Sequence, residues 1–266
     1  MMGVCADTDA IPIFVISLKQ SPERFRRLQE ELARFGLQPR LVRGIDGRRK
    51  SSLLKRLWRR QFFSARHNRF LSPGEIGCFA SHVRVLREII RNQIPRAIIL
   101  EDDVIFSEDF GAFYRFDLPR MLDVADIVKF EGHVYPHTSR GGLTVVRGKT
   151  CRAVVPMRPS LCSAAYAVSL RGAKSLARVA QDVDEPYDFI VHGYERHNAR
   201  YCEVRPLLVK QADTVSIIGD EGRNLSPSRL RDIGIIAAAR QLVYKAVWRP
   251  ANATQSWFMA CILPLV

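Results

Sequence analysis

The sequence feature that most constrains the fold is a short apolar run that ends in three consecutive carboxylates. Residues 96–100 are Arg-Ala-Ile-Ile-Leu, residues 101–103 are Glu-Asp-Asp, and residues 104–106 are Val-Ile-Phe. An uninterrupted apolar run of this length, directly after Pro95, predicts a strand buried on both faces, as in parallel sheets. Ligands of open α/β sheets bind beyond the carboxyl ends of such strands. The run therefore predicts an α/β fold with a site at residues 101–103.

Three adjacent carboxylates repel one another and lose hydration in a folded protein, so Glu101, Asp102 and Asp103 need a compensating partner. A divalent cation supplies one, and hard cations such as Mn²⁺ or Mg²⁺ prefer oxygen ligands. We predict that Asp103 is a metal ligand, joined by Asp102 or Glu101. A cation that also holds a diphosphate at a strand end is typical of enzymes acting on nucleotide-sugars. The alternative is a solvated acidic turn without a metal.

The N-terminal region has the pattern with which a doubly wound sheet begins. Residues 11–18 predict a buried strand, and Ser21 followed by Pro22 predicts the start of a helix. The apolar residues of this helix fall on one face, and Gly36 is a suitable stop. Strand, turn and helix in this order favour an α/β architecture.

A second strand at residues 39–42 leads to a tight turn at residues 44–47, which presents Asp46. Asp46 is a candidate to accept hydrogen bonds from a ribose or base, although an Asp before a Gly also commonly serves only to form the turn. Ser72 and Glu75 form a capping box, which predicts a helix that ends before Pro95. On this helix, His82 has either a structural or a chemical role, and Cys78 is interpreted as a core residue.

Two later segments carry carboxylates that are candidates for acid–base chemistry. Residues 126–131 predict a strand that ends at Glu131, so this carboxylate is expected to face the same crevice as residues 101–103. Asp188 and His192 lie in a second cluster of carboxylates and histidines. An acceptor hydroxyl needs a carboxylate base apart from those on the metal, and we predict Asp188, with Glu131 second. His192 is a candidate metal ligand, although its spacing is not specific to metal sites.

The rest of the domain alternates irregular and regular segments. Residues 133–155 are small, polar and basic, and they predict an irregular excursion over the active site. Residues 163–170 predict a strand, and the following helix extends through Ala180. With no internal repeat or linker, we expect one domain over residues 11–220.

The formal net charge of +14 indicates an anionic partner, which is nucleic acid, a membrane surface or a phosphorylated substrate. Basic residues concentrate at 48–69, where a flap over a phosphorylated acceptor and a solvated helix are equally compatible with the pattern. Residues 221–266 are expected to form a helical extension. Its apolar end at 257–266 is too short to cross a bilayer, so it either lies in a membrane interface or packs against the domain.

The cysteines favour an intracellular location. The six cysteines are scattered without a CxxC pair, which excludes zinc-ribbon and redox-motif sites. We find no secretion signal in the sequence, and we expect reduced thiols in the cytoplasm.

Taken together in chain order, several segments resemble glycosyltransferase family 25, the bacterial lipooligosaccharide transferases. The joint match is specific, whereas each piece alone is weak, and it covers residues 11 to 190. The matching pieces are Val15–Leu18 with Arg24, Gly44–Gly47, Leu71–Cys78 with Ser81 and His82, Leu100–Val104, Ala165–Ser169 with Gly172 and Ala173, and Pro186–Asp188.

The resemblance implies a GT-A type, Rossmann-like single domain with a mixed, mostly parallel sheet, a UDP-sugar donor and inversion at the anomeric carbon. Ser17 stands where the family usually has Asn, and the basic segment and the C-terminal extension have no counterpart. Carried onto matched positions, the resemblance makes the following residues candidates for donor binding: Ser17, Arg24, Asp46, Gly47, Ser81, His82, Glu101 and Asp102.

The resulting hypothesis is a metal-dependent transferase that moves galactose or glucose from a UDP-sugar to a lipid-linked or oligosaccharide acceptor. It is expected at the cytoplasmic face of the inner membrane, with peripheral contact to anionic lipid and without nucleic acid as a partner. The alternatives are a metal-dependent phosphohydrolase, since acidic strand ends also build such sites, and a basic nucleic-acid- or membrane-binding protein without catalysis. A family member that has lost turnover and acts as a scaffold is a further alternative.

Overall fold

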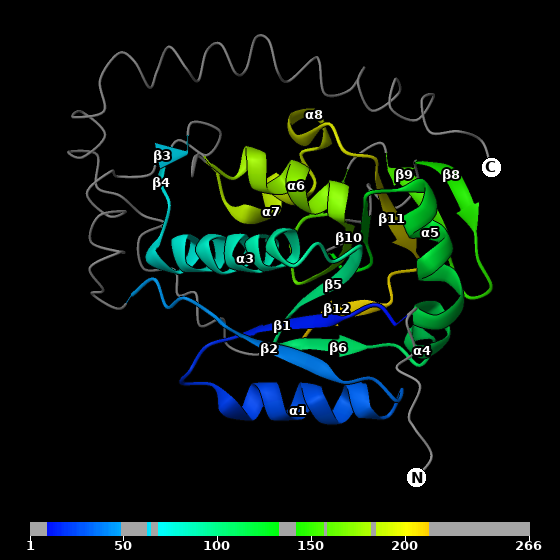
Figure 1. The fold of residues 1–266 in the computed structure, drawn as a ribbon, viewed down its shortest axis with the longest axis horizontal. Helices are drawn as coiled ribbons and strands as arrows, with labels where there is room; N and C mark the ends of the chain where they lie inside the picture. The colour runs from blue at the N-terminus through cyan, green and yellow to red at the C-terminus, as the bar shows by residue number, and fades with distance from the viewer. Residues whose placement is uncertain are drawn as a thin grey trace.

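The computed structural model describes residues 10–48, 63–64, 69–132, 142–156, 159–181 and 185–212. Over these residues the chain folds as helices packed on both faces of an eight-stranded mixed sheet (Figure 1). The strands of this sheet are β1 (Ile13–Ser17), β2 (Pro39–Arg43), β5 (Arg96–Glu101), β7 (Ile127–Lys129), β8 (Gly142–Arg147), β9 (Arg152–Pro156), β10 (Ala165–Ser169) and β11 (Tyr201–Arg205). The predicted α/β class and the mixed sheet are confirmed.

The strand order β2-β1-β5-β10-β7-β11-β9-β8 places the first strand of the chain inside the sheet. β1 pairs in parallel with both β2 and β5, and β7 pairs in parallel with β11. β10 runs antiparallel to both of its neighbours, β5 and β7. Two successive reversals leave β5 and β7 pointing the same way, so the carboxyl ends of β1, β2, β5 and β7 meet at one edge of the sheet.

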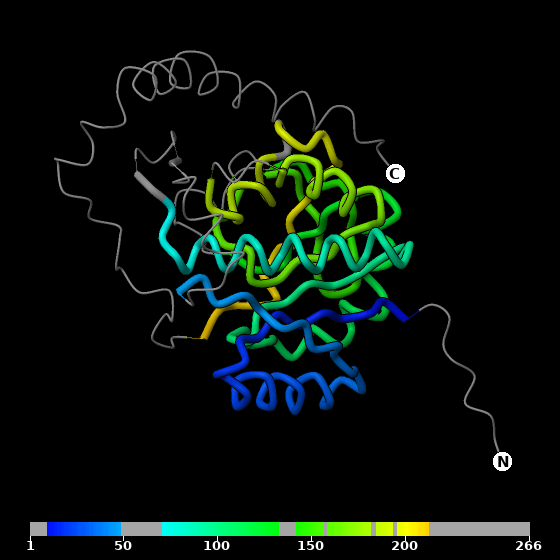
Figure 2. The backbone as a smooth tube through the Cα atoms, turned by 60° about the vertical axis from the view of Figure 1, so that its left-hand side comes forward, coloured from blue at the N-terminus to red at the C-terminus, as the bar shows by residue number. Residues whose placement is uncertain are grey.

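The helices form two layers, one on each face of the sheet, as Figures 1 and 2 both show. α1 (Pro22–Ala33) and the run of α4 (Phe110–Ala112), the π-helical turn η1 (Phe113–Asp117) and α5 (Leu118–Val124) contribute to one buried apolar cluster. α3 (Pro73–Arg91), α6 (Leu170–Val179) and α7 (Tyr187–Val191) contribute to the other. The short α8 (Tyr194–His197) follows α7.

β5 separates the two clusters, as the apolar run of the sequence predicts. Ala97, Ile98, Ile99 and Leu100 are fully buried, and their side chains alternate between the two faces. Because neither face of the middle of β5 meets water, the four residues between Arg96 and Glu101 are all apolar.

The starts of two helices test the capping predictions. At α3, the Ser72 hydroxyl accepts from the Glu75 amide at 3.2 Å, and the Glu75 carboxylate accepts from the Ser72 amide at 2.7 Å, so the capping box is confirmed. α1 begins at Pro22 as predicted, but the Ser21 side chain makes no capping hydrogen bond. Gly36 lies beyond the end of α1 with φ of +75°, a conformation that favours glycine.

Two small sheets complete the fold of the described residues. β6 (Val104–Phe106) pairs antiparallel with β12 (Val209–Gln211), which arrives from the end of the described chain. β3 (Phe63–Ser64) pairs antiparallel with β4 (Arg69–Phe70).

The irregular excursion predicted over residues 133–155 is wrong for residues 142–155. β8 and β9 form an antiparallel hairpin that extends the sheet at the edge far from β1. The prediction failed because the glycine and basic residues of an exposed edge strand resemble loop composition, although Val154 and Val155 of β9 are buried.

Several sequence-based expectations concern residues that the structure does not describe. Most of the basic segment 48–69 and the extension 221–266 lie outside the described residues, so their predictions stand as they were made. No helix among the described residues is long and apolar enough to cross a membrane.

Candidate active site

A cleft lies where the carboxyl ends of β1, β2 and β5 meet. Its walls come from the ends of these strands, the turn after β2, the first turns of α3, and β12. It contains eight of the predicted site residues: Arg24, Asp46, Gly47, Ser81, His82, Glu101, Asp102 and Asp103. The topology therefore gathers side chains that are up to 79 positions apart in the sequence.

The acidic turn after β5 faces the guanidinium of Arg24 on α1. Arg24 Nη1 lies 3.8 Å from Asp102 Oδ1 and 3.7 Å from Asp103 Oδ2. Burial, reinforced by the charges of Glu101 and Asp102, raises the pKa of Asp103 to about 6. Burial also raises the pKa of Asp102, against the hydrogen bond from Ser17 and the charge of Arg24. One cation therefore does not compensate the carboxylates fully.

The donor set of this turn fits a hard divalent cation. Among the described residues, Asp103 Oδ1 is buried and has no hydrogen-bond partner, an arrangement that costs free energy unless another group binds the oxygen. Asp102 and Asp103 offer only oxygen atoms, which Mn²⁺ and Mg²⁺ prefer. An orphaned carboxylate oxygen beside a second carboxylate supports the predicted metal ligands Asp103 and Asp102.

The acidic turn is held in place by a strand from the end of the described chain. The Ala212 amide donates to the Asp103 carbonyl at 2.7 Å, and the Gln211 side chain hydrogen-bonds to the Asp103 carboxylate. β12 itself pairs with β6, directly after the turn. Sequence reasoning missed Gln211, because nothing in its local pattern indicates that it reaches a turn more than a hundred residues earlier.

The turn after β2 presents Asp46 to the cleft. Its carboxylate accepts from the Arg48 amide at 3.0 Å and from the Gln20 side-chain amide at 2.8 Å. Partial burial opposes these hydrogen bonds, but they outweigh it and lower the pKa of Asp46. Asp46 is thus ionised, and it forms the turn and borders the cleft at once.

Ser81 has a structural role in this arrangement. Its hydroxyl accepts from the Ile45 amide at 2.7 Å and donates to the Gly77 carbonyl at 2.6 Å. The hydroxyl proton is therefore used within the protein, and Ser81 fixes the turn against α3. Gly47 lies so close to α3 that a Cβ on it would come within 1.6 Å of the Pro73 carbonyl oxygen.

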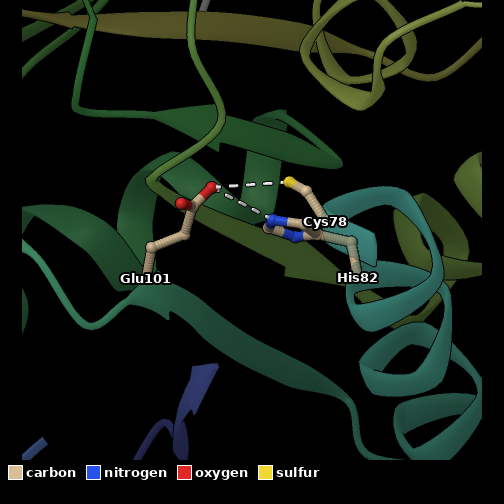
Figure 3. Close-up of side chains that lie close together, drawn as sticks. All are labelled: Cys78, His82 and Glu101. Carbon is tan, nitrogen blue, oxygen red and sulfur yellow. Dashed lines mark hydrogen bonds and ion pairs between the residues drawn. The ribbon is translucent and has the colours of Figure 1, made fainter. Parts of the chain in front are cut away.

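His82 and Cys78 project from α3 toward Glu101 at the end of β5 (Figure 3). His82 Nε2 lies 3.3 Å from Glu101 Oε1, and the Cys78 thiol donates to the same oxygen at 3.9 Å. Burial, together with the charge of Glu101, raises the pKa of Cys78 well above its ordinary value. Cys78, interpreted from sequence as a core residue, is only half-buried and lines the cleft. Its spacing of four residues from His82 was the available signal.

The two candidate bases lie beside the cleft instead of on its wall. Glu131 follows β7 at the same sheet edge, is 2% exposed and accepts from the Ala164 amide at 3.2 Å. Burial, with Glu101 adding to it and Lys129 opposing it, raises the pKa of Glu131 to about 7. Asp188 is half-buried in the first turn of α7, and burial raises its pKa against the charge of Lys129.

The remaining predicted residues, Ser17 and His192, do not line the cleft. Ser17 ends β1 and is buried behind the acidic turn, where its hydroxyl bonds to Asp102. His192 caps the end of α7, and its ring packs edge-on against Phe189 at 4.9 Å between centroids. His192 therefore does not join Asp102 and Asp103 in lining the cleft.

Comparison with known proteins identifies a family. The model of glycosyltransferase family 25 (LPS biosynthesis protein) matches residues 10–191. Mouse procollagen galactosyltransferase 2 is 26% identical over 175 residues, which are 62% of this chain and 27% of that protein. The bovine probable inactive glycosyltransferase 25 family member 3 is 28% identical over 221 residues, which are 74% of this chain and 36% of that protein.

This chain thus spans about a third or less of the length of these relatives. Among solved structures, the apo form of mouse xyloside xylosyltransferase 1 is similar to this chain, with 14% sequence identity and a TM-score of 0.35. The match covers 72% of this chain and 83% of that chain. The family model, by contrast, covers more than half of the chain, including the acidic turn, the Asp46 turn and α3. The chain belongs to glycosyltransferase family 25.

Proposed function

We propose that this protein is an active transferase that moves galactose or glucose from a UDP-sugar to a lipooligosaccharide or another surface glycan, with inversion at the anomeric carbon. The observation that carries the proposal is the meeting of Asp103, Arg24 and Asp46 in one cleft. This combination offers oxygen ligands, a guanidinium suited to phosphate and a carboxylate suited to a ribose or base hydroxyl. The galactosyltransferase named among the relatives favours galactose.

The acidic turn would hold Mn²⁺ or Mg²⁺ through Asp103 and Asp102, and the bound ion would neutralise charge on the departing diphosphate. Arg24 is on α1 and its guanidinium lies beside this turn, so it is placed to bind a diphosphate oxygen. Asp46 lines the same cleft, where its carboxylate is suited to the nucleoside. Glu101 and His82 border the same space and position the donor.

Inversion in one displacement needs a base that takes the proton of the acceptor hydroxyl. We assign this role to Asp188, with Glu131 as the second candidate. Both carboxyls have raised pKa values because they are buried, and a base with a pKa nearer neutrality takes up a proton more readily than an ordinary carboxylate. Both also lie apart from the carboxylates assigned to the metal.

The proposed acceptor and the proposed cellular location rest on the net charge of the protein. A net charge of +14 suits a phosphorylated, lipid-linked acceptor and peripheral contact with anionic lipid at the cytoplasmic face of the inner membrane. Cosedimentation with anionic but not with neutral vesicles would support this assignment. Binding to generic DNA or RNA with a steep salt dependence would instead revive the nucleic-acid alternative.

The decisive experiment measures UDP release from a panel of UDP-sugars with Mn²⁺ or with EDTA. The wild type is compared with Asp103→Ala and with a matched control, Asp109→Ala, which changes an exposed carboxylate six residues away. We expect slow hydrolysis of one donor that requires metal, is lost in Asp103→Ala and is retained in Asp109→Ala. The sugar of that donor identifies the substrate.

Other outcomes contradict the proposal in distinct ways. UMP or phosphate as the product would indicate a phosphohydrolase. If no donor is hydrolysed and calorimetry detects no UDP-sugar binding, the protein belongs with those relatives that are named inactive. Binding without hydrolysis would call for the same assay with a glycan acceptor, and absence of transfer there would also reject the proposal.

A further inference from the structure

The cleft contains a second group of potential metal ligands with a different chemical character. Cys78, His82 and Glu101 each direct one ligand atom toward the others, and the three atoms lie within 4.8 Å of one another (Figure 3). Cys78 and His82 come from successive turns of α3, and Glu101 comes from the end of β5. Two rigid elements thus support this group, which does not include Asp102 or Asp103.

The distances agree with those of a coordinated ion. At tetrahedral angles and usual zinc bond lengths, a nitrogen and an oxygen ligand lie about 3.4 Å apart, and a sulfur and an oxygen about 3.6 Å apart. The corresponding distances here are 3.3 Å between His82 Nε2 and Glu101 Oε1 and 3.9 Å between Cys78 Sγ and Glu101 Oε1. Side-chain shifts of a few tenths of an ångström would therefore bring both Glu101 contacts to these values, and the Cys78 and His82 ligand atoms lie within 4.8 Å of each other.

The hydrogen bonds behind His82 orient the ring as they do in metal sites. His82 Nδ1 lies 3.1 Å from the Tyr166 hydroxyl, which lies 2.9 Å from the Tyr187 hydroxyl. The ring also stacks on Tyr187, with centroids 4.2 Å apart. A hydroxyl can accept from Nδ1–H, and the next hydroxyl can accept in turn, so the pair of tyrosines stabilises the tautomer whose Nε2 lone pair is free for a metal.

We propose that Cys78, His82 and Glu101 form a site for a thiophilic divalent cation such as Zn²⁺, distinct from the oxygen-only site at Asp102 and Asp103. A thiolate, an imidazole and one carboxylate favour zinc over Mn²⁺ or Mg²⁺. Three protein ligands leave a fourth position, which opens to the cleft that all three residues line. Binding releases the Cys78 thiol proton to solvent, while His82 coordinates through Nε2 and carries its proton on Nδ1. The proposal concerns cation binding and does not depend on transferase activity.

The test uses Co²⁺ as a spectroscopic substitute for zinc, added to the full-length, metal-free protein. We expect a thiolate-to-cobalt charge-transfer band that saturates at one equivalent and is abolished by excess Zn²⁺. The band should disappear in Cys78→Ser and persist in two controls. Cys151→Ser removes a buried thiol in the turn between β8 and β9, and Asp103→Asn changes the oxygen-only site.

Zn²⁺ affinity, measured by competition with a chromophoric chelator, gives a second readout. Loss of an outer residue that supports a ligand costs about 10–100-fold in metal affinity, so loss of the ligand in Cys78→Ser or Glu101→Gln should cost at least as much. Circular dichroism establishes that each variant is folded, and Glu101→Gln gives an independent test if Cys78→Ser does not fold. The proposal is overturned if the wild type shows no charge-transfer band, or if Cys78→Ser retains both the band and the affinity.

Discussion

The backbones of Gly47 and Gly77 are in direct contact, so neither residue has room for a side chain. A Cβ on Gly77 would lie 2.6 Å from the Gly47 amide nitrogen, and one on Gly47 would lie 1.6 Å from the Pro73 carbonyl oxygen. The turn that carries Asp46 therefore rests directly on the first turns of α3. Asp46, on this turn, and His82, on α3, both line the cleft.

Gly47→Ala is expected to lower the free energy of unfolding by about 1–3 kcal/mol, because the new methyl group pushes backbone against backbone. It should also weaken UDP binding, because Asp46 moves with the turn. Urea denaturation and calorimetry measure the two effects. Gly44→Ala is the matched control in the same turn, since its Cβ would meet the end of the Leu18 side chain at 3.1 Å and no other atom closer than 3.4 Å. Equal effects of both substitutions would contradict the role of the close contact.

Asp188→Asn is expected to reduce transfer by about 10²–10⁴-fold, because the amide cannot accept the proton of the acceptor hydroxyl. UDP binding should be unchanged, since Asp188 lies beside the donor cleft and not on its wall. Steady-state kinetics with the acceptor and calorimetry with UDP separate these effects. Retention of transfer in Asp188→Asn together with its loss in Glu131→Gln would assign the base to Glu131.

Asp126 makes the stability of the protein depend on acid pH. Burial alone would raise its pKa, but hydrogen bonds from Arg171 and Arg200 outweigh burial and lower the pKa to about 2. A folded-state pKa below the ordinary value of 3.8 stabilises the protein at pH values above 3.8, and this contribution is lost as the pH falls toward 2. The difference corresponds to about 2 kcal/mol.

Asp126→Asn should therefore have a lower free energy of unfolding than the wild type at pH 6, as measured by urea denaturation. The difference in free energy of unfolding between the two proteins should narrow by about 2 kcal/mol as the pH falls toward 2. Asp109→Asn, at an exposed carboxylate, is the control and should follow the wild type. A gap that stays constant with pH would show that the two arginines do not act through the charge of Asp126.

Tyr166→Phe tests the chain of hydroxyls behind His82. The substitution leaves the Tyr187 hydroxyl and His82 Nδ1 buried without the partner that both share, which costs about 1–3 kcal/mol. Tyr187→Phe should cost less, since His82 keeps its contact with Tyr166. Urea denaturation at neutral pH compares the two variants. Both substitutions keep the aromatic rings that stack on His82, so a larger loss in Tyr187→Phe would contradict the central position of the Tyr166 hydroxyl.

Local patterns were sufficient to predict much of the fold. The apolar run at 97–100 predicted a strand buried on both faces, and the capping box at Ser72 predicted the start of α3, because each feature depends on neighbours in the sequence. The hairpin of β8 and β9 was missed, because an edge strand is identified by its partner and not by its own composition.

The same distinction applies to the site. Asp103, Asp46 and His82 were predicted because they follow strands or lie on a recognisable helix, and the structure brings them into one cleft. Gln211 was missed because it reaches the cleft only through the pairing of β12 with β6, a contact between distant parts of the chain. The proximity of Cys78 and His82 to Glu101 was missed because the local sequence does not show that the end of β5 faces α3.

The hydrogen bonds from Gln211 and Ala212 to Asp103 also determine when the cleft is completed during synthesis. The acidic turn, Arg24 and α3 leave the ribosome early, but Gln211 and the Ala212 amide follow about a hundred residues later. A nascent chain that stops before β12 contains every carboxylate of the cleft and lacks the strand that orients them. In such a chain the Asp103 carbonyl and carboxylate lack their partners on β12, so we expect the order of translation to delay the ordering of the acidic turn until the last described strand is made.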